Sequence, residues 1–124
     1  MFPDASAMVA ILTDEADARA LAAQMTSAAA VWETAINAAR ILGISLPEIE
    51  IEIQRFLAEM GIQVMPIPPQ SAHLAIVAFD RFGKGRHPAQ LNFGDCMAYA
   101  CARHYQMPMM FKGQDFALTD IEVA

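Results

Sequence analysis

MFPDASAMVAIL, residues 1–12, opens the chain and decides its fold class. A very short apolar segment of strand character ends at Asp4, and a helix is predicted to begin near Ser6, where apolar residues start to recur at helical spacing. A strand that passes directly into a helix is typical of α/β proteins, in which helices cover a parallel sheet. We therefore expect Asp4 to follow the carboxyl end of a strand, where open parallel sheets bind ligands.

The remainder of the chain continues the alternation of helices and short strands. Apolar periodicity, caps and turn residues predict helices near 13–25, 30–42, 46–60, 72–82 and 93–105, and strands near 62–67 and 109–111. The run Ile-Glu-Ile-Glu-Ile at 49–53 also fits a strand, but the apolar residues keep the helical period across a longer window. The tail from Gly113 onward is expected to be irregular apart from a last short strand. These segments predict a three-layer α/β fold.

The composition predicts a single cytoplasmic domain that covers part of its surface with a partner. A chain of 124 residues suits one domain, and a hydrophobic fraction of 56 % predicts apolar surface that a homodimer would cover. The chain has no cationic leader and no apolar run of membrane-spanning length, so no membrane association is expected. Cys96 and Cys101 lie in one predicted helix and point to different faces, which favours free thiols in a reducing compartment.

The net charge of −6 argues against a protein that coats nucleic acid through many basic side chains. It does not exclude a nuclease, because carboxylates that hold divalent cations present positive charge to phosphate. The main concentration of basic residues comprises Lys84, Arg86, His87 and Lys112. We expect these residues either to contact RNA phosphates or to belong to a solvated loop.

Four acidic residues occupy chemically informative positions. Asp4 and Asp115 each follow a predicted strand, whereas Glu33 and Asp95 lie in otherwise apolar helical segments. Each also has a structural interpretation, as a helix cap, a solvated charge, a first-turn acid or a turn residue. If the four meet, their mutual repulsion requires a cation, and oxygen ligands without His or Cys select Mg²⁺ or Mn²⁺. The residues alone leave open whether they meet.

Several short motifs follow one another along the chain. They are Asp-Ala-Ser-Ala at 4–7, Glu33 after Thr-Ser-Ala at 26–28, Gly-Lys-Gly-Arg-His at 83–87, Asn-Phe-Gly-Asp-Cys at 92–96, and Phe-Lys-Gly-Gln-Asp-Phe at 111–116 with Leu-Thr-Asp-Ile at 118–121. In this order they resemble the motifs of VapC-type toxins of the PIN-domain family. The resemblance implies a single PIN domain over residues 1–124. Its fold would be a PIN-like three-layer α/β/α arrangement with a short parallel central sheet of four to five strands.

The resemblance also implies a function and a site. The implied function is a Mg²⁺- or Mn²⁺-dependent endoribonuclease, the toxin of a type II toxin–antitoxin pair, with RNA as substrate and a cognate VapB-like antitoxin as partner. The catalytic acids would be Asp4, Glu33, Asp95 and Asp115, of which the first three would bind the metal ion. Ser6 would orient Asp4 or its water, unless it is an ordinary helix cap.

Three positions near these motifs carry further expectations. Pro3 has no N–H to donate, so the first strand is expected to lack one ladder bond. Gln114 stands where this motif often carries another acid, which leaves the far side of the metal site less negative. Asp115, rather than Asp120, is expected to supply the fourth carboxylate, because Gly113 lets the backbone turn just before it.

Two other classes of function compete with the nuclease. One is a catalytically weak PIN-fold binding module that acts mainly through a protein partner; the acids Asp4, Glu33 and Asp95 favour the enzyme over it. The other is a response-regulator-like phosphoacceptor, which also carries carboxylates after parallel strands. That class needs an acidic pair at the first strand and a strand-borne central Asp with a Lys, and the chain has no such set.

Overall fold

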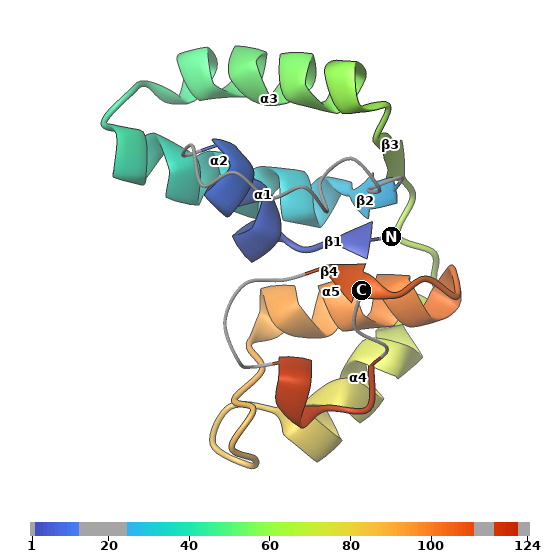
Figure 1. The fold of residues 1–124 in the computed structure, drawn as a ribbon. Helices are drawn as coiled ribbons and strands as arrows, with labels where there is room; N and C mark the ends of the chain where they lie inside the picture. Colours follow the sequence, from blue (N-terminus) through green and yellow to red (C-terminus); the bar gives the residue numbers. More distant parts are fainter. Residues whose placement is uncertain (1, 13–24, 111–115, 122–124) are drawn as a thin grey trace.

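The computed structural model in Figure 1 describes residues 2–12, 25–110 and 116–121. The predicted helix at 13–25 lies outside these residues except for its last position, and so do Lys112, Gln114 and Asp115. The predicted strand at 109–111 is described up to residue 110. Expectations that concern the remaining positions stay predictions.

Helices and short strands alternate along the described chain. The strands are β1 (Phe2–Pro3), β2 (Met25–Ser27), β3 (Gln63–Met65) and β4 (Met109–Met110). The α-helices are α1 (Ala5–Leu12), α2 (Ala28–Leu42), α3 (Leu46–Met60), α4 (Ser71–Phe82) and α5 (Phe93–His104). In the tail, where a last short strand is predicted, the described residues 116–121 hold a 3-10 helix, η2 (Phe116–Leu118), and no strand. The Thr119 amide and hydroxyl both donate to the Phe116 carbonyl, at 3.0 and 2.7 Å, and so close a turn in place of a strand.

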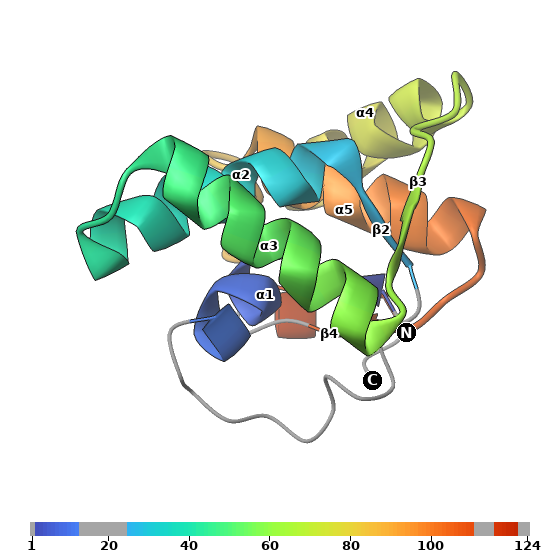
Figure 2. The same ribbon diagram turned by 90° about the horizontal axis from the view of Figure 1, so that it is seen from above.

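β1 and β4 lie between two groups of helices (Figure 1), and β2 and β3 lie side by side (Figure 2). On one side α1, α2 and α3 pack together with α3 outermost, and on the other side α4 and α5 pack against each other. Each group has its own apolar core, built around Ile49 and Ile53 in the first group and around Leu91 and Met109 in the second. The arrangement agrees with the predicted α/β class. Among the described helices, none is both long and apolar enough to cross a bilayer.

The described strands form two separate parallel ladders of two strands each. β1 pairs with β4, with Phe2 opposite Met109, and β2 pairs with β3, with Met25 opposite Gln63. The prediction of one central sheet of four to five strands is therefore wrong for the described residues. β1 lies beside β2, but Pro3 has no N–H for a ladder, and the contact between these strands is a bond from the Thr26 hydroxyl to the Pro3 carbonyl at 3.5 Å.

Strand β2 is absent from the sequence prediction, which ends a helix at Met25 and treats the next two residues as a break. Thr26 and Ser27 are both buried, so the strand shows no alternation of apolar and polar residues. At three residues it is also too short for a periodic signal. Ser27 then caps α2, since its Oγ accepts a hydrogen bond from the Ala30 amide at 3.2 Å.

The ambiguous run at 49–53 is helical, as the longer window predicts. Ile49 and Ile53 are buried whereas Ile51 is exposed, which is the pattern of a helix face and not of a strand. Ser45 caps this helix by accepting from the Glu48 amide at 3.3 Å. Gly61 ends it in the left-handed conformation, with φ of 67°.

Both cysteines lie in α5 and are buried free thiols, as predicted. Burial raises the pKa of Cys96 to about 11, and the neighbouring Asp95 carboxylate adds to the shift. Burial also raises the pKa of Cys101, although a contact with Ser71 offsets part of the effect. Thiols with raised pKa values are poor nucleophiles, which agrees with a role in the core.

Candidate active site

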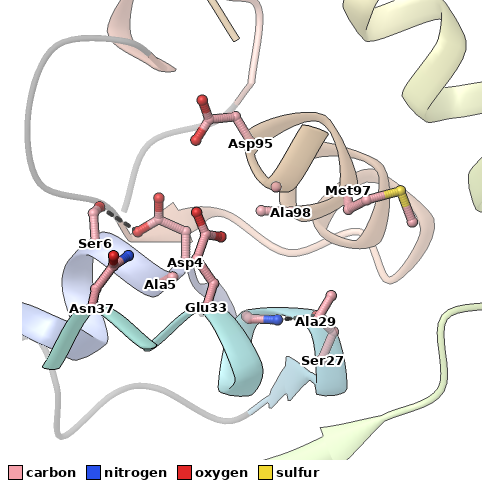
Figure 3. Close-up of a pocket in the computed structure, with 12 residues that line it drawn as sticks. Asp4, Ala5, Ser6, Ser27, Ala29, Glu33, Asn37, Asp95, Met97 and Ala98 are labelled. Atoms are coloured by element: carbon pink, nitrogen blue, oxygen red, sulfur yellow. Dashed lines mark hydrogen bonds between the residues drawn. The ribbon is translucent and has the colours of Figure 1, made fainter. Parts of the chain in front are cut away.

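A small cavity lies where the amino-terminal parts of α1, α2 and α5 converge beyond the ends of β1 and β2 (Figure 3). Its volume is about 90 Å³. The lining residues are Asp4, Ala5, Ser6, Ser27, Ala29, Ala30, Glu33, Asn37, Gly94, Asp95, Met97 and Ala98. Three of the four predicted acids thus line one cavity, and the fourth, Asp115, lies outside the described residues.

Asp4 is buried at the end of β1, with 5 % of its surface exposed. Its Oδ1 accepts hydrogen bonds from the Ser6 hydroxyl at 2.6 Å and from the Ala7 amide at 3.0 Å. Asp4 therefore caps α1, so its structural interpretation is correct without excluding the functional one. Ser6 is the second residue of α1 and not its cap, and its hydroxyl holds the Asp4 carboxylate in place.

The surroundings of Asp4 disfavour the charged form of its carboxylate. Burial raises its pKa to about 7, the hydrogen bonds from Ser6 and Ala7 offset part of that rise, and the charges of Asp95 and Glu33 add to it. A buried acid near other acids is costly to ionise, and a cation placed among them would lower that cost.

Glu33 enters the cavity from α2 and lies against the first turn of α5. A Cβ atom built on Gly94 would stand 2.4 Å from Glu33 Oε2 and 2.9 Å from its Cδ. Glu33 can approach the helix this closely because Gly94 has no side chain. Burial raises the pKa of Glu33, and Asp95 adds to the shift. The sequence analysis misses this role of Gly94; a glycine, a poor helix former, in a helix's first turn is the signal that points to it.

Asp95 is shared between the cavity and its own helix. Its Oδ2 accepts from the Asn92 amide at 2.9 Å, and its own amide donates to Asn92 Oδ1 at 2.9 Å, which together form a capping box. The interpretation of Asp95 as a first-turn acid is therefore correct as far as it goes. The same carboxylate raises the pKa values of Asp4 and Glu33, so it also acts on the cavity.

Asn37 is a lining residue that the sequence analysis misses. It lies four residues after Glu33 on α2, so the two side chains share one face of the helix. Figure 3 shows its carboxamide on the side of the cavity where Ser6 lies. The spacing of four from a candidate ligand is the signal by which the sequence points to it.

The lining suits a hard divalent cation by donor type. It offers three carboxylates, two hydroxyls and one amide, and none of the lining residues is His or Cys. Within residues 2–12, 25–110 and 116–121, no three acidic, His or Cys side chains are gathered closely enough to form a ready-made ligand group. Three carboxylates around one ion would therefore have to come closer together than they are in this structure.

Comparison with known proteins places the chain in a family. The family model of the PIN domain matches residues 1–122. The chain belongs to the PIN-domain family. It is 38 % identical to Ribonuclease VapC of Mycolicibacterium smegmatis, with 98 % of this chain and 97 % of the relative covered. In Mycobacterium tuberculosis, Ribonuclease VapC28 is 39 % identical (100 % and 97 % covered) and Ribonuclease VapC30 is 35 % identical (98 % and 95 % covered). These matches confirm the resemblance that the motifs suggest.

The basic loop of this PIN domain does not line the cavity. Arg86 pairs with Asp80 at 3.2 Å, and its guanidinium lies over the Phe79 ring, 5.6 Å from the centroid. His87 Nδ1 accepts from the Ala89 amide at 3.1 Å. Lys84 is exposed. Two of the three described members of the predicted RNA-contact set thus take part in local structure, and their contact with RNA remains a prediction.

Asp120 is committed to a surface cluster away from the cavity. Its carboxylate accepts from the Tyr99 hydroxyl at 2.6 Å and pairs with Arg81 at 2.9 Å. Burial alone would raise the pKa of Asp120, but Tyr99 and Arg81 outweigh it and hold the pKa below the ordinary value. Asp120 is thus held by Arg81 and Tyr99, and it is not among the residues that line the cavity.

Proposed function

We propose that this chain is a Mg²⁺- or Mn²⁺-dependent endoribonuclease and the toxin of a type II toxin–antitoxin system, built as a single PIN domain over residues 1–124. The observation that carries the proposal is the cavity itself, in which the buried Asp4, with a pKa of about 7, faces Glu33 and Asp95. Relatives of nearly the same length are named Ribonuclease VapC, which supports RNA as the substrate.

In this proposal the side chains of the cavity have separate roles. Asp4, Glu33 and Asp95 hold the cation, and the Ser6 hydroxyl fixes the orientation of the Asp4 carboxylate. When bound, the ion would activate water and neutralise charge on the phosphodiester. Asp115 remains the proposed fourth acid.

The size of the cavity sets what part of the RNA enters it. About 90 Å³ is far below the roughly 300 Å³ or more typical of pockets that enclose a small organic ligand. It admits an ion with water and a phosphate group, whereas a whole nucleotide does not fit. Selection among RNA sequences would therefore take place outside the cavity. Lys84, Arg86, His87 and Lys112 are the proposed phosphate contacts there, and they would hold the RNA without reading its sequence.

The proposed partners are a second copy of the chain and a VapB-like antitoxin. Two apolar grooves support them. One lies between α2 and α3, has a volume of about 450 Å³ and includes Trp32, which is 67 % exposed. The other lies along α4 and the start of α5, has a volume of about 620 Å³ and includes Ile76 and Phe93, which are 68 % and 77 % exposed. Such exposed apolar surface is typical of protein interfaces.

One observation favours the alternative, a catalytically weak binding module. Asp95 Oδ2 is held in its own helix cap, so this acid is less available to a cation than its position suggests. A protein of this kind would keep the grooves and the fold but cleave RNA poorly.

Cleavage of single-stranded or loop RNA by the purified protein tests the proposal. Mg²⁺ or Mn²⁺ should support cleavage, Zn²⁺ should support it poorly, and EDTA should stop it. Asp4→Asn should abolish the activity, whereas Glu59→Gln, the same change at an exposed position on α3, should not. Full activity in excess EDTA would disprove the metal mechanism. A wild-type protein that is inactive with both cations yet binds a partner would support the binding module.

A further inference from the structure

The Asn37 carboxamide faces the cavity. Asn37 is partly buried on α2, and Figure 3 shows its side chain among those that line the cavity. In the part of the chain that the structure describes, the carboxamide makes no hydrogen bond. A polar group that is neither fully solvated nor satisfied by protein is available to a ligand.

The other polar side chains of the cavity are mostly acceptors or are already engaged. The three carboxylates only accept when ionised. The Ser6 hydroxyl donates to Asp4, and the Ser27 oxygen accepts from the Ala30 amide in the cap of α2. The two N–H donors of Asn37 therefore stand out in a lining that otherwise presents negative charge.

We propose that Asn37 binds the RNA backbone by donating a hydrogen bond to a non-bridging oxygen of the phosphodiester. This inference rests on the proposed function. A phosphate brought beside three carboxylates is repelled by them, and a neutral amide donor attracts its oxygen without adding to the charge of the cluster. Since the volume of the cavity suits a phosphate group and not a whole nucleotide, the contact is made to a group that every nucleotide carries. Asn37 thus contributes affinity and position, not sequence selection.

The competing role for Asn37 is that of a metal ligand, and a carboxylate at this position distinguishes the two roles. The Asn37 oxygen is a possible ligand for Mg²⁺ or Mn²⁺, because carbonyl oxygens bind hard cations. In that role a carboxylate at this position would hold the ion at least as well. For a donor to phosphate, the same carboxylate would remove the donor and add repulsion.

The test compares Asn37→Ala and Asn37→Asp with Gln63→Ala, which removes an exposed amide on β3 far along the chain from the cavity. KM and kcat for a fluorogenic RNA in Mn²⁺ are measured together with the rise in melting temperature that Mn²⁺ causes without RNA. Asn37→Ala should raise KM about tenfold to hundredfold and leave kcat within about threefold, because the bond serves ground state and transition state alike. Asn37→Asp, which is close to isosteric, should lose more of kcat/KM than Asn37→Ala. The thermal response to Mn²⁺ should be unchanged in Asn37→Ala.

Several outcomes would overturn the inference. An unchanged KM in both variants would show that Asn37 does not contact the substrate. A weaker thermal response to Mn²⁺ in Asn37→Ala, restored in Asn37→Asp, would make it a metal ligand instead. If the wild-type protein does not cleave RNA with either cation, the proposed function itself fails and this inference fails with it, whereas an active wild type with an unchanged Asn37→Ala removes only the inference.

Discussion

Replacing Gly94 by alanine should separate the stability of the protein from its activity. The added Cβ would lie 2.4 Å from Glu33 Oε2, 1.0 Å closer than the 3.4 Å at which ordinary contact begins. The nearest atoms belong to the end of a flexible side chain, so the Glu33 carboxylate can retreat by about 1 Å without disturbing the backbone. A displacement of that size within a catalytic constellation costs about a hundredfold in rate.

The same substitution should not destabilise the fold. Alanine is favoured over glycine inside a helix by about 0.5–1 kcal/mol, and Gly94 lies in the first turn of α5. For a chain of this length, that gain corresponds to a rise of a few degrees in melting temperature, of which the displaced Glu33 takes back a part. We therefore expect an unchanged or slightly higher melting temperature together with a loss of kcat/KM of about tenfold to hundredfold.

A double-mutant cycle tests the physical reason. The four proteins are the wild type, Gly94→Ala, Glu33→Ala and the double variant, each assayed for RNA cleavage in Mn²⁺ and for thermal unfolding. If Gly94 acts through Glu33, Gly94→Ala should reduce the activity of the wild type but not that of Glu33→Ala. An equal loss in both backgrounds, or a fully active Gly94→Ala protein, would refute this reasoning.

Three further predictions follow from the acids. Burial raises the pKa of Asp4 from 3.8 to about 7, so the protein in EDTA should lose stability, on the order of 4 kcal/mol, as pH rises between these values. Thermal unfolding of Asp4→Asn should lack this dependence of stability on pH, and an unchanged dependence would contradict the assignment. Asp95→Asn should abolish cleavage but keep the melting temperature in EDTA, since an amide oxygen can still accept from the Asn92 amide; a clear drop would mark Asp95 as mainly structural. Asp115→Asn should lower turnover more than Mg²⁺ affinity. Asp120→Asn should leave cleavage intact and cost about 1 kcal/mol of stability in urea titration. An inactive Asp120→Asn protein beside an active Asp115→Asn protein would reverse the two roles.

Local features of the sequence determined the helices and several of their ends. The buried Ile49 and Ile53 with the exposed Ile51 agree with the helical period that the sequence predicts for α3, and Ser45 and Gly61 cap that helix as their residue types require. These features depend on contacts within a few residues, and such contacts can be predicted from the sequence. The short strand β2 could not be predicted, because its three residues show no alternation of apolar and polar side chains.

Part of the candidate site could be predicted from the sequence for a similar reason. Asp4 could be singled out because it follows a strand, and the order of the motifs added Glu33 and Asp95. That these three acids line one cavity was decided by the packing of α1, α2 and α5, which lie far apart in the chain.

Two details of the site became clear only in the tertiary structure, although the sequence holds a signal for each. Gly94 matters because Glu33 comes from another helix to lie against it, and Asn37 matters because it shares a cavity whose acceptors come from three elements. Contacts between distant segments depend on how whole helices pack, and no short window of sequence encodes that packing. The packing also decides the pKa of Asp4, because burial raises it and the charges of Asp95 and Glu33 add to the rise.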